Sequence, residues 1–445
     1  MIKAIQLTNL TCNLINSDLL KNRLNMAKLP VEKSNKLIYE LFHIGVISQN
    51  EIIDDKNIEK LTELGFIRKI EIEDLLFENL KEKVLKSYKH FPIRNIEAMN
   101  FELTYDCNSN CPHCILKSVR KSFHGNELSY ECVQRIIADA YFAGLLQNGI
   151  NFTGGEALLA KTDIFELIRY ASSYGIPTRL FTNSFWGNKL FFKAANRRFT
   201  SPLSLIKKFK SSGLNQLSLS FDSRFDKDKV GVKQLSTIIH ACETIGLHYE
   251  IISSPEIREH LNKFIEYLKL TLGINHLKYM TPITMELVDM GGAISFNHNN
   301  LSDLSLKELI DKSLCKSKGY FQPKMLTIAP NGDVRSCMYG LGLNNLGNIH
   351  KSNLLDVIND FEDEVSIAFA EKQAFELADI IYEPYKEIYK PISHPCSACV
   401  LLARLLQEYF ILKKKDEHTN EQLLQMNYKV AKDLNLLKDN LKFKE

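Results

Sequence analysis

The chain has 445 residues, of which 45% are hydrophobic and 24% charged, and its formal net charge is +3. This length predicts two to three domains around a large buried core, and the composition is that of a soluble globular protein. The small net charge gives no indication of nucleic-acid binding, no apolar run approaches the ~18 residues of a membrane span, and the N-terminal residues lack the features of an export signal.

Ten cysteines are spread over the chain. Without an export signal, we expect them to be metal ligands and buried thiols rather than disulfides. Low-potential metal clusters need a reducing compartment, so the expected location is the cytoplasm, with no nucleic-acid or membrane partner. Cys132 and Cys242 have no cysteine at ligand spacing, and we interpret them as packing residues of helices, although an epimerase would need a radical-quenching thiol.

The N-terminal part, residues 1–94, is predicted to be a small winged-helix-like domain. An amphipathic helix is expected over 32–47, and Asn57 is expected to cap a second helix. Residues 66–72 then alternate as a strand, and a further helix is predicted over 73–90.

Residues 95–290 alternate between strands and helices, which predicts an α/β domain with a parallel sheet. The segment 186–201 is longer and more basic than a simple connection needs; a solvated surface loop is the preferred interpretation, and a substrate contact is the alternative. The expected strands lie near 99–105, 149–153, 178–182, 216–221, 248–253 and 276–280, and the expected helices near 127–147, 161–174, 202–212, 230–246 and 256–272.

Cys107, Cys111 and Cys114 follow the first of these strands directly, with the spacing C-x3-C-x2-C. Thiolate ligands select soft sites such as zinc or iron–sulfur clusters. Three thiolates on a [4Fe–4S] cluster would leave one iron open to a small ligand. A zinc knuckle and a chance grouping are the alternatives.

This motif resembles that of the radical S-adenosylmethionine (SAM) superfamily, and the resemblance covers about residues 95–400. It implies a partial (β/α)6 TIM-like barrel whose cluster binds SAM through its open iron and cleaves it to a 5'-deoxyadenosyl radical. It also implies a reducing partner such as flavodoxin or ferredoxin.

Other strand ends carry residues that match the same family. Gly154, Gly155 and Glu156 resemble the GGE motif that grips the amino group of SAM, and their glycines allow a close backbone approach. Asn183 lies in a T-N-S ending, where the family has T-N-G. His113, between two cysteines, stands where members place a ring near adenine.

The fourth strand places Ser218, Ser220 and Asp222 on one face. By resemblance, Ser220 would contact the carboxylate or ribose of SAM. A satisfied polar residue of the core is the alternative for these hydroxyls. Nothing in the sequence assigns a role to Asp222.

The region 291–400 resembles the SPASM/twitch extension of radical SAM enzymes. A hairpin is predicted with its turn at Asn331-Gly332, and 401–445 is expected to be a helical tail. Four thiolates can saturate one auxiliary [4Fe–4S] cluster or one zinc ion. These distal thiols are Cys315, Cys337, Cys396 and Cys399.

The leading functional hypothesis is an enzyme that abstracts a hydrogen from a ribosomally made precursor peptide and forms a crosslink or another oxidised product. The N-terminal unit weakly resembles leader-peptide recognition domains; a structural cap on the barrel is the alternative. A dehydrogenase or epimerase of a small molecule, such as an aminocyclitol or sugar, is the rival enzyme. A non-catalytic electron carrier is the third hypothesis, and the Gly-Gly-Glu motif argues against it.

Overall fold

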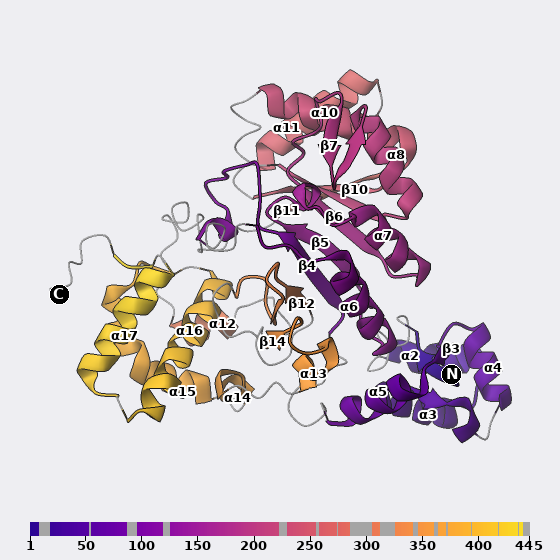
Figure 1. Cartoon of the computed structure of the whole chain (residues 1–445), viewed down its shortest axis with the longest axis horizontal. Coiled ribbons are helices and arrows are strands. Elements are labelled where there is room, and N and C mark those ends of the chain that lie inside the picture. Colours follow the sequence, from indigo (N-terminus) through magenta and orange to yellow (C-terminus); the bar gives the residue numbers. More distant parts are fainter. Residues whose placement is uncertain are drawn as a thin grey trace.

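The chain forms an N-terminal domain, a central α/β barrel and a C-terminal bundle of helices, with the first and last at opposite ends of the barrel (Figure 1). The computed structural model describes residues 1–8, 18–52, 55–86, 96–118, 125–221, 229–254, 258–273, 275–284, 305–311, 325–340, 346–359, 364–370, 373–392, 394–416, 418–434 and 436–438.

A nine-stranded sheet with the order β11-β10-β9-β6-β5-β4-β12-β13-β14 forms the centre of the molecule. Its first six strands in that order are parallel. The predicted α/β partial barrel is therefore confirmed. Their bounds are β4 Ala98–Thr104, β5 Gly149–Gly154, β6 Thr178–Thr182, β9 Gln216–Ser220, β10 Tyr249–Ser253 and β11 Met280–Thr284.

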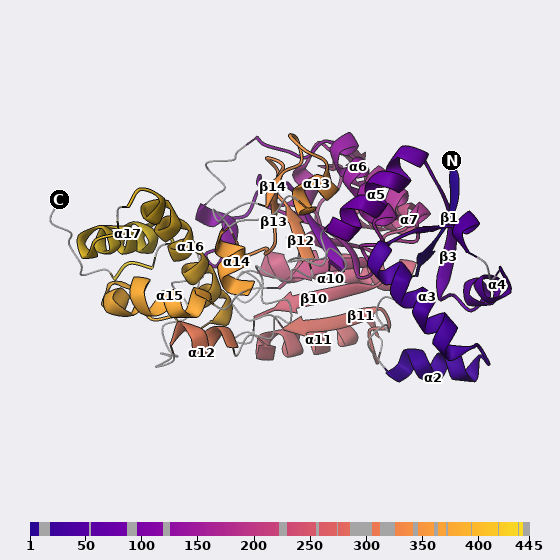
Figure 2. The same cartoon turned by 90° about the horizontal axis from the view of Figure 1, so that it is seen from below.

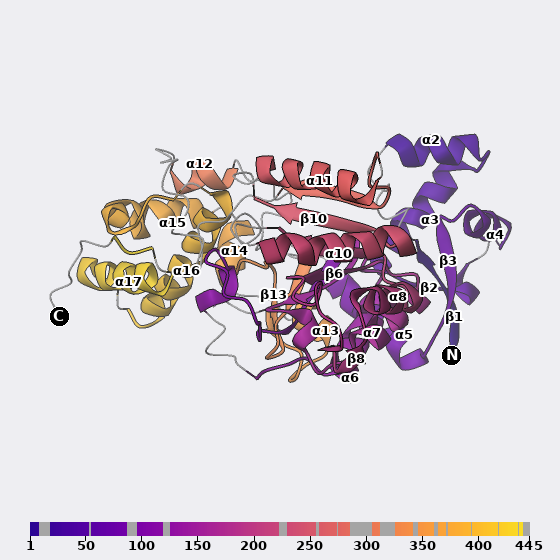
Figure 3. The same ribbon diagram turned by 90° about the horizontal axis from the view of Figure 1, so that it is seen from above.

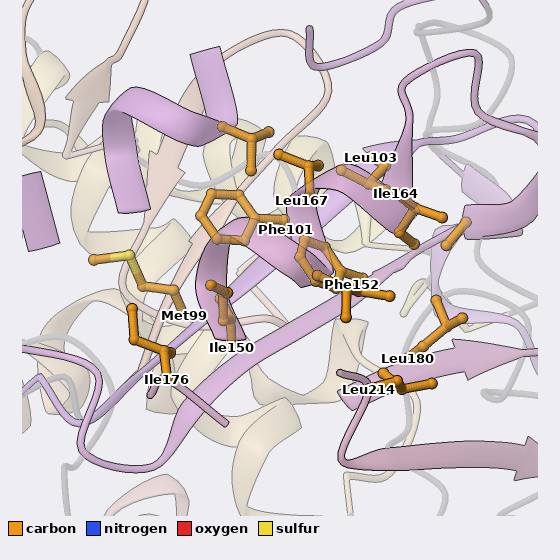
Figure 4. Packing of buried hydrophobic residues seen from close by; sticks show 14 of the residues in the cluster. Met99, Phe101, Leu103, Ile150, Phe152, Ile164, Leu167, Ile176, Leu180 and Leu214 are labelled. Carbon is orange, nitrogen blue, oxygen red and sulfur yellow. The ribbon is translucent and has the colours of Figure 1, made fainter. Parts of the chain in front are cut away.

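Helices pack on one face of this sheet because alternate residues of the strands are apolar. Phe101 and Phe152 from neighbouring strands stack with ring centroids 6.1 Å apart, and they lie among Leu103, Ile164 and Leu167 in the core (Figure 4). The helices are α6 Tyr130–Phe142, α7 Ile164–Ser173, α8 Pro202–Ser212, α10 Lys229–Ile245 and α11 Arg258–Leu272. All five helices agree with the sequence prediction, and Cys132 and Cys242 are buried in α6 and α10 as expected.

The sixth strand begins four residues later than predicted, at Met280 instead of residue 276. The carboxylate of Glu243 at the end of α10 accepts the backbone N–H groups of Lys278 and Tyr279, at 3.0 and 3.1 Å, and holds this segment outside the sheet. Pro282 lies inside β11. Proline is tolerated there because β11 is the last strand of the sheet order.

The N-terminal domain contains a three-stranded antiparallel sheet with the order β2-β1-β3. The sequence prediction missed its first strand. Its elements are β1 Ile2–Leu7, α2 Asp18–Met26, α3 Val31–Ile44, β2 Ile47–Ser48, the 3-10 helix η1 Gln49–Glu51, α4 Asp55–Glu63, β3 Ile67–Ile72 and α5 Asp74–Lys86.

The predicted capping role of Asn57 is wrong. Asn57 is the third residue of α4 and is buried, and its side-chain oxygen accepts a hydrogen bond from the Ser34 hydroxyl at 3.3 Å. A buried amide needs a partner, so Asn57 joins α4 to α3 rather than starting a helix.

Side chains of β1 and β3 attach the N-terminal domain to the end of α6. Gln6 donates its amide to the carbonyl of Phe142 at 2.6 Å, and the Arg68 guanidinium donates to Gln6 at 2.9 Å through Nε. The same guanidinium lies 3.9 Å from the ring centroid of Tyr141. Helix α6 ends where the chain turns back to begin β5, so this contact lies at the end of the barrel where strands begin.

The barrel strands point away from the N-terminal domain and toward the C-terminal helices. Figure 2 shows the arrows of β10 and β11 directed toward the helical bundle, and Figure 3 shows the same direction for β10 from the opposite side. The carboxyl ends of the parallel strands therefore lie on the side of the bundle. In barrels of this kind, that is the side where reactive groups gather.

The C-terminal region adds a hairpin to the barrel sheet and then forms the helical bundle. The predicted hairpin is confirmed: β12 and β13 are antiparallel, and Gly332 takes a φ of 85° in the turn. The predicted division at 400/401 falls inside α16. The elements are α12 Leu306–Asp311, β12 Met325–Ile328, β13 Asp333–Arg335, β14 Gly347–Asn348, α13 Leu354–Asn359, α14 Glu364–Ala370, α15 Gln373–Ile381, η7 Glu383–Ile388, α16 Pro395–Lys414 and α17 Asn420–Asp433.

Helix α16 corrects one expectation from composition, because within the described residues it is long and apolar enough to cross a membrane. Its apolar residues, among them Leu401, Leu402 and Leu405, are buried against the other helices of the bundle. A core helix of a bundle meets the same length and composition test.

The segment 186–201 is not the solvated loop that was preferred from the sequence. It contains a small hairpin, β7 Phe192–Ala194 and β8 Arg197–Phe199, that packs on the barrel helices. Trp186 is fully buried and stacks with Phe192. Arg197 bridges to Asp163 at the start of α7, so this basic residue of the segment has a structural partner.

The buried position of Trp186 leads us to expect a fluorescence signal, because it is the single tryptophan of the chain. The folded protein should emit at short wavelength and shift to longer wavelength on unfolding. Trp186→Ala should lower the free energy of unfolding by about 3–5 kcal/mol, and Trp186→Phe by much less. Emission typical of a water-exposed indole in the folded protein would contradict the packed hairpin.

Candidate metal and cofactor site

Cys107, Cys111 and Cys114 lie in the loop that connects β4 to the 3-10 helix η3, Ile115–Ser118. All three side chains are half-buried thiols. The loop leaves the carboxyl end of β4, and the backbone N–H of Cys114 donates to the carbonyl of Cys111 at 3.2 Å. The loop thus presents three soft donors on the side of the sheet that faces the helical bundle.

Two hydrogen bonds reach the sulfur of Cys107. The backbone N–H of Ser109 donates to its Sγ at 3.4 Å, and the side-chain amide of Asn183 donates at 3.6 Å. Hydrogen bonds to ligand sulfurs stabilise a thiolate and tune an iron–sulfur cluster. The donor set and its polar surroundings therefore fit a thiolate-bound cluster. Within the described ranges, no group of three or more His, Cys, Asp or Glu side chains is placed to hold a single metal ion, whereas the thiolates of a cluster bind separate irons and lie farther apart.

Gly154 and Gly155 are needed for the approach of β5 to the cysteine loop. A Cβ atom on Gly155 would lie 2.4 Å from the carbonyl oxygen of Asp106, and one on Gly154 would lie 2.3 Å from that of Thr104. The Gly155 N–H donates to Thr104 at 2.7 Å, and the Glu156 N–H donates to Asp106 at 2.9 Å. The close approach that the sequence predicted toward a ligand is also an approach to the chain's own backbone, one residue before Cys107.

Glu156 is 1% exposed and joins the ends of two strands. One of its carboxylate oxygens accepts the N–H of Leu158 at 3.2 Å, and the other accepts the N–H of Asn183 at 2.7 Å. Asn183 also donates its side-chain amide to Asn108 at 2.9 Å. The cysteine loop, the Gly-Gly-Glu segment and Asn183 are thus brought together by direct hydrogen bonds.

Ser184, which stands where the similar family has glycine, keeps the backbone conformation that glycine favours. Its φ is 66°, in the left-handed region, and its buried hydroxyl has no hydrogen-bond partner within the described residues. The turn at the end of β6 therefore holds a serine in a left-handed conformation, at some cost in backbone strain.

Ser218 faces the barrel interior but is a satisfied core residue. Its hydroxyl donates to Glu250, and it accepts Nε of Arg179 at 2.8 Å. Arg179 also forms an ion pair with Glu250, which is 1% exposed. The alternative that the sequence left open, a buried polar residue with partners, describes Ser218 correctly.

The structure gives less detail for the remaining residues predicted from the sequence. Ser220 ends β9 and is half-buried, pairing in register with Ile252 of β10. His113 is half-buried in the cysteine loop. Asp222 lies outside the described residues.

Three of the distal cysteines lie around the junction of the hairpin and the bundle. Cys337 follows β13 by two residues, and Cys396 and Cys399 lie in the first turns of α16. Tyr339, two residues after Cys337, packs against the core of the bundle together with Cys396 and Cys399, and burial raises the pKa of its phenol. Cys315 lies outside the described residues, but α12, which ends four residues before it, packs against α16.

The sequence analysis missed two buried ionic residues on the inner face of the sheet. Glu102 of β4 and Arg335 of β13 form an ion pair, and their side chains are 6% and 5% exposed. Charged residues inside predicted strands, at the alternation positions that face the barrel interior, were the available signal.

The family model for the Radical SAM superfamily matches residues 101–245. Two curated relatives are PqqA peptide cyclases: that of Rhodopseudomonas palustris is 34% identical over 87 residues, and that of Bradyrhizobium diazoefficiens 32% over 87 residues. In each case the match covers 20% of this chain and 22% of the relative. The chain thus spans about a fifth of the length of these first relatives. A putative glycyl-radical enzyme activating enzyme of Methanocaldococcus jannaschii is 29% identical over 130 residues, 29% of this chain and 45% of that protein.

Solved structures with a similar chain path include native anSMEcpe with bound AdoMet, with a TM-score of 0.39 and 18% identity over 76% of this chain and 96% of that chain. Methylornithine synthase (PylB) has a TM-score of 0.29 and 14% identity over 57% of this chain and 71% of that chain.

The geometry predicts that Gly155→Ala disturbs the cysteine loop, because the new methyl group would meet backbone carbonyls that cannot move separately. After anaerobic reconstitution, this variant should bind less iron than the unchanged protein. Gly175→Ala is the control: its position has a φ of 68° and open space around the added Cβ, so it should lose stability but keep its iron. Equal iron content in both variants would contradict the proposed contact.

Proposed function

Because this chain belongs to the radical SAM superfamily through the domain at residues 101–245, we propose that it is an enzyme that modifies a ribosomally made peptide by hydrogen abstraction. Cys107, Cys111 and Cys114 would hold a [4Fe–4S] cluster. When bound, the cluster supplies an electron that cleaves SAM to a 5'-deoxyadenosyl radical. The observation that carries this proposal is the hydrogen-bonded convergence of the ends of β5 and β6 on the cysteine loop, which follows β4.

The residues around the loop have separate tasks in this proposal. Glu156 and Asn183 would bind and orient the polar end of SAM, since both lie at strand ends that touch the loop. Gly154 and Gly155 allow the cysteine loop to lie close against the backbone at the end of β5. Ser220 and His113 would contribute further contacts to the cofactor from β9 and from the loop itself.

Cys315, Cys337, Cys396 and Cys399 would hold an auxiliary [4Fe–4S] cluster, with zinc as the alternative metal. Tyr339, two residues after Cys337, packs against the same bundle core as Cys396 and Cys399, which supports a common site. Four thiolates leave no open iron, so the task of this site would be electron transfer: it would accept the electron left on the substrate after hydrogen abstraction.

Two observations support a peptide as the substrate. The relatives with the matched segment include PqqA peptide cyclases. In the N-terminal domain, β3 is an outer strand of its sheet, and an outer strand can bind an extended peptide by strand addition. A reduced flavodoxin or ferredoxin would supply electrons.

Substitutions in the two cysteine groups should cause the loss of different activities. Cys107→Ala should abolish cleavage of SAM by the reduced protein, because the cluster loses a ligand. Cys396→Ala should retain uncoupled SAM cleavage and lose product formation. Chromatography of 5'-deoxyadenosine and mass spectrometry of the substrate measure the two activities. Full SAM cleavage by Cys107→Ala would refute the proposed role of the loop.

The peptide proposal is tested by coexpression with short peptides encoded beside the gene, followed by mass spectrometry. We expect a mass loss in one peptide that depends on Cys107. SAM cleavage without any peptide product, together with oxidation of a small polyol, would favour the dehydrogenase alternative.

The mode of peptide binding is tested at Lys69 in β3. The N–H of Thr8 donates to the carbonyl of Phe66, and Lys69 stands opposite Ile5. Hydrogen bonds of an antiparallel pair alternate along the strand, so the backbone N–H of Lys69 points away from β1. Lys69→Pro removes this N–H and should weaken binding of the peptide, whereas the control Lys69→Ala keeps it and should bind normally. Equal affinity of both variants would exclude strand addition on β3.

A further inference from the structure

The hairpin that follows the barrel is built into the barrel sheet beside the strand that carries the cysteine loop. Strand β12 pairs with β4 in parallel, with Met325 opposite Ala98 and Ile328 opposite Phe101. More than 200 residues separate these strands in sequence, and Figure 1 shows β12 directly beside β4. A segment that the sequence analysis assigned to a separate domain therefore forms one side of the candidate site.

A buried ionic contact fastens this hairpin to β4. Arg335 of β13 pairs with Glu102 of β4, and the Tyr105 hydroxyl donates to the same carboxylate at 2.7 Å. Burial raises the pKa of Glu102, whereas the charge of Arg335 lowers it. Buried charges are tolerated when they are paired and hydrogen-bonded. Removing one partner leaves the other charge buried and unpaired, which strongly destabilises the fold.

The same hairpin supports both ends of the cysteine loop. Ala329 at its turn packs with Tyr105, two residues before Cys107, and with Leu116, two residues after Cys114. All three packing residues are buried. Tyr105 is therefore held in two ways, by packing in the cluster with Ala329 and by the hydrogen bond from its hydroxyl to Glu102, and the cysteine loop begins just after it.

We propose that Glu102 and Arg335 are positioning residues of the SAM-cleaving site: their ion pair anchors Tyr105 and thereby sets the cysteine loop against the C-terminal hairpin. This inference rests on the proposed role of Cys107, Cys111 and Cys114. It makes assembly of that site depend on docking of the hairpin. It also sets the distance from the loop to Cys337, which follows Arg335 by two residues.

The test compares Arg335→Met with the double variant Glu102→Leu plus Arg335→Met. The single variant leaves the buried carboxylate of Glu102 without its charged partner and should lower the Tm. The double variant removes both charges and should recover most of the Tm. Both should lose the change that SAM causes in the electron paramagnetic resonance spectrum of the reduced protein, with SAM binding weakened by at least about tenfold, as expected when a charge-assisted anchor is lost. Because a saturated distal cluster does not bind SAM, this change reports on the loop alone.

The chain offers a control in Arg179 and Glu250, a second ion pair on the inner face of the same sheet, in which Glu250 is buried and Arg179 is 28% exposed. Arg179→Met plus Glu250→Leu should affect the Tm in the same manner and leave the SAM response in place. Tyr105→Phe, which keeps the ion pair and removes one hydroxyl, should weaken SAM binding with little change in Tm.

The outcomes separate the two proposals. If the unchanged protein binds no iron and shows no response to SAM, the proposed function fails. If the unchanged protein responds, and the Glu102/Arg335 double variant responds equally, the positioning role is overturned. If the SAM response falls together with the Tm in every variant, including the Arg179/Glu250 control, the ion pair is only a structural element. That result would also overturn the positioning role.

Discussion

The candidate site depends on a close approach between two strand ends, which only glycine permits. At Gly155 the backbone of β5 comes so near to the carbonyl of Asp106 that a methyl group has no room. This contact fixes the position of the cysteine loop relative to the end of β5. Glu156 then reaches the backbone of Asn183, and Asn183 reaches the sulfur of Cys107. The contact between Asn183 and Cys107 presupposes the first, because a displaced loop would lose it.

The second constraint is the extension of the barrel sheet by the C-terminal hairpin. Parallel pairing of β12 with β4 places Ala329 against the ends of the cysteine loop and Arg335 beside Glu102. Cys107 and Cys337, far apart in sequence, then follow two strands of one sheet. An electron carrier at the distal group would therefore be attached to the same rigid support as the cysteine loop.

The N-terminal domain is attached to the opposite end of the barrel. Its contacts through Gln6 and Arg68 reach the end of α6, where the strands begin, whereas the cysteine loop lies where they end. A strand of about five to seven residues spans roughly 20 Å at about 3.3 Å per residue. A peptide held on β3 would have to extend along the barrel over at least this length, so recognition and modification would use well-separated parts of the substrate.

The sequence by itself determined the features that depend on local spacing. Strand alternation, helix periodicity and the Asn331-Gly332 turn predicted the barrel units and the hairpin, and the positions of Cys107, Cys111 and Cys114 predicted soft-metal chemistry. These signals arise from residues a few positions apart, where backbone geometry alone brings side chains together. The sequence prediction started β11 too early, because Glu243, more than thirty residues away, accepts a hydrogen bond from the segment that precedes the strand.

Only the tertiary structure decided which distant residues meet. It made Ser218 a partner of Glu250 rather than a ligand contact, buried Trp186 in a segment that has the composition of a surface loop, and placed Arg335 against Glu102. The physical reason is common to all three. A polar or aromatic side chain in a strand or loop is stable either in water or beside a buried partner, and the identity of that partner is set by packing between segments remote in the chain.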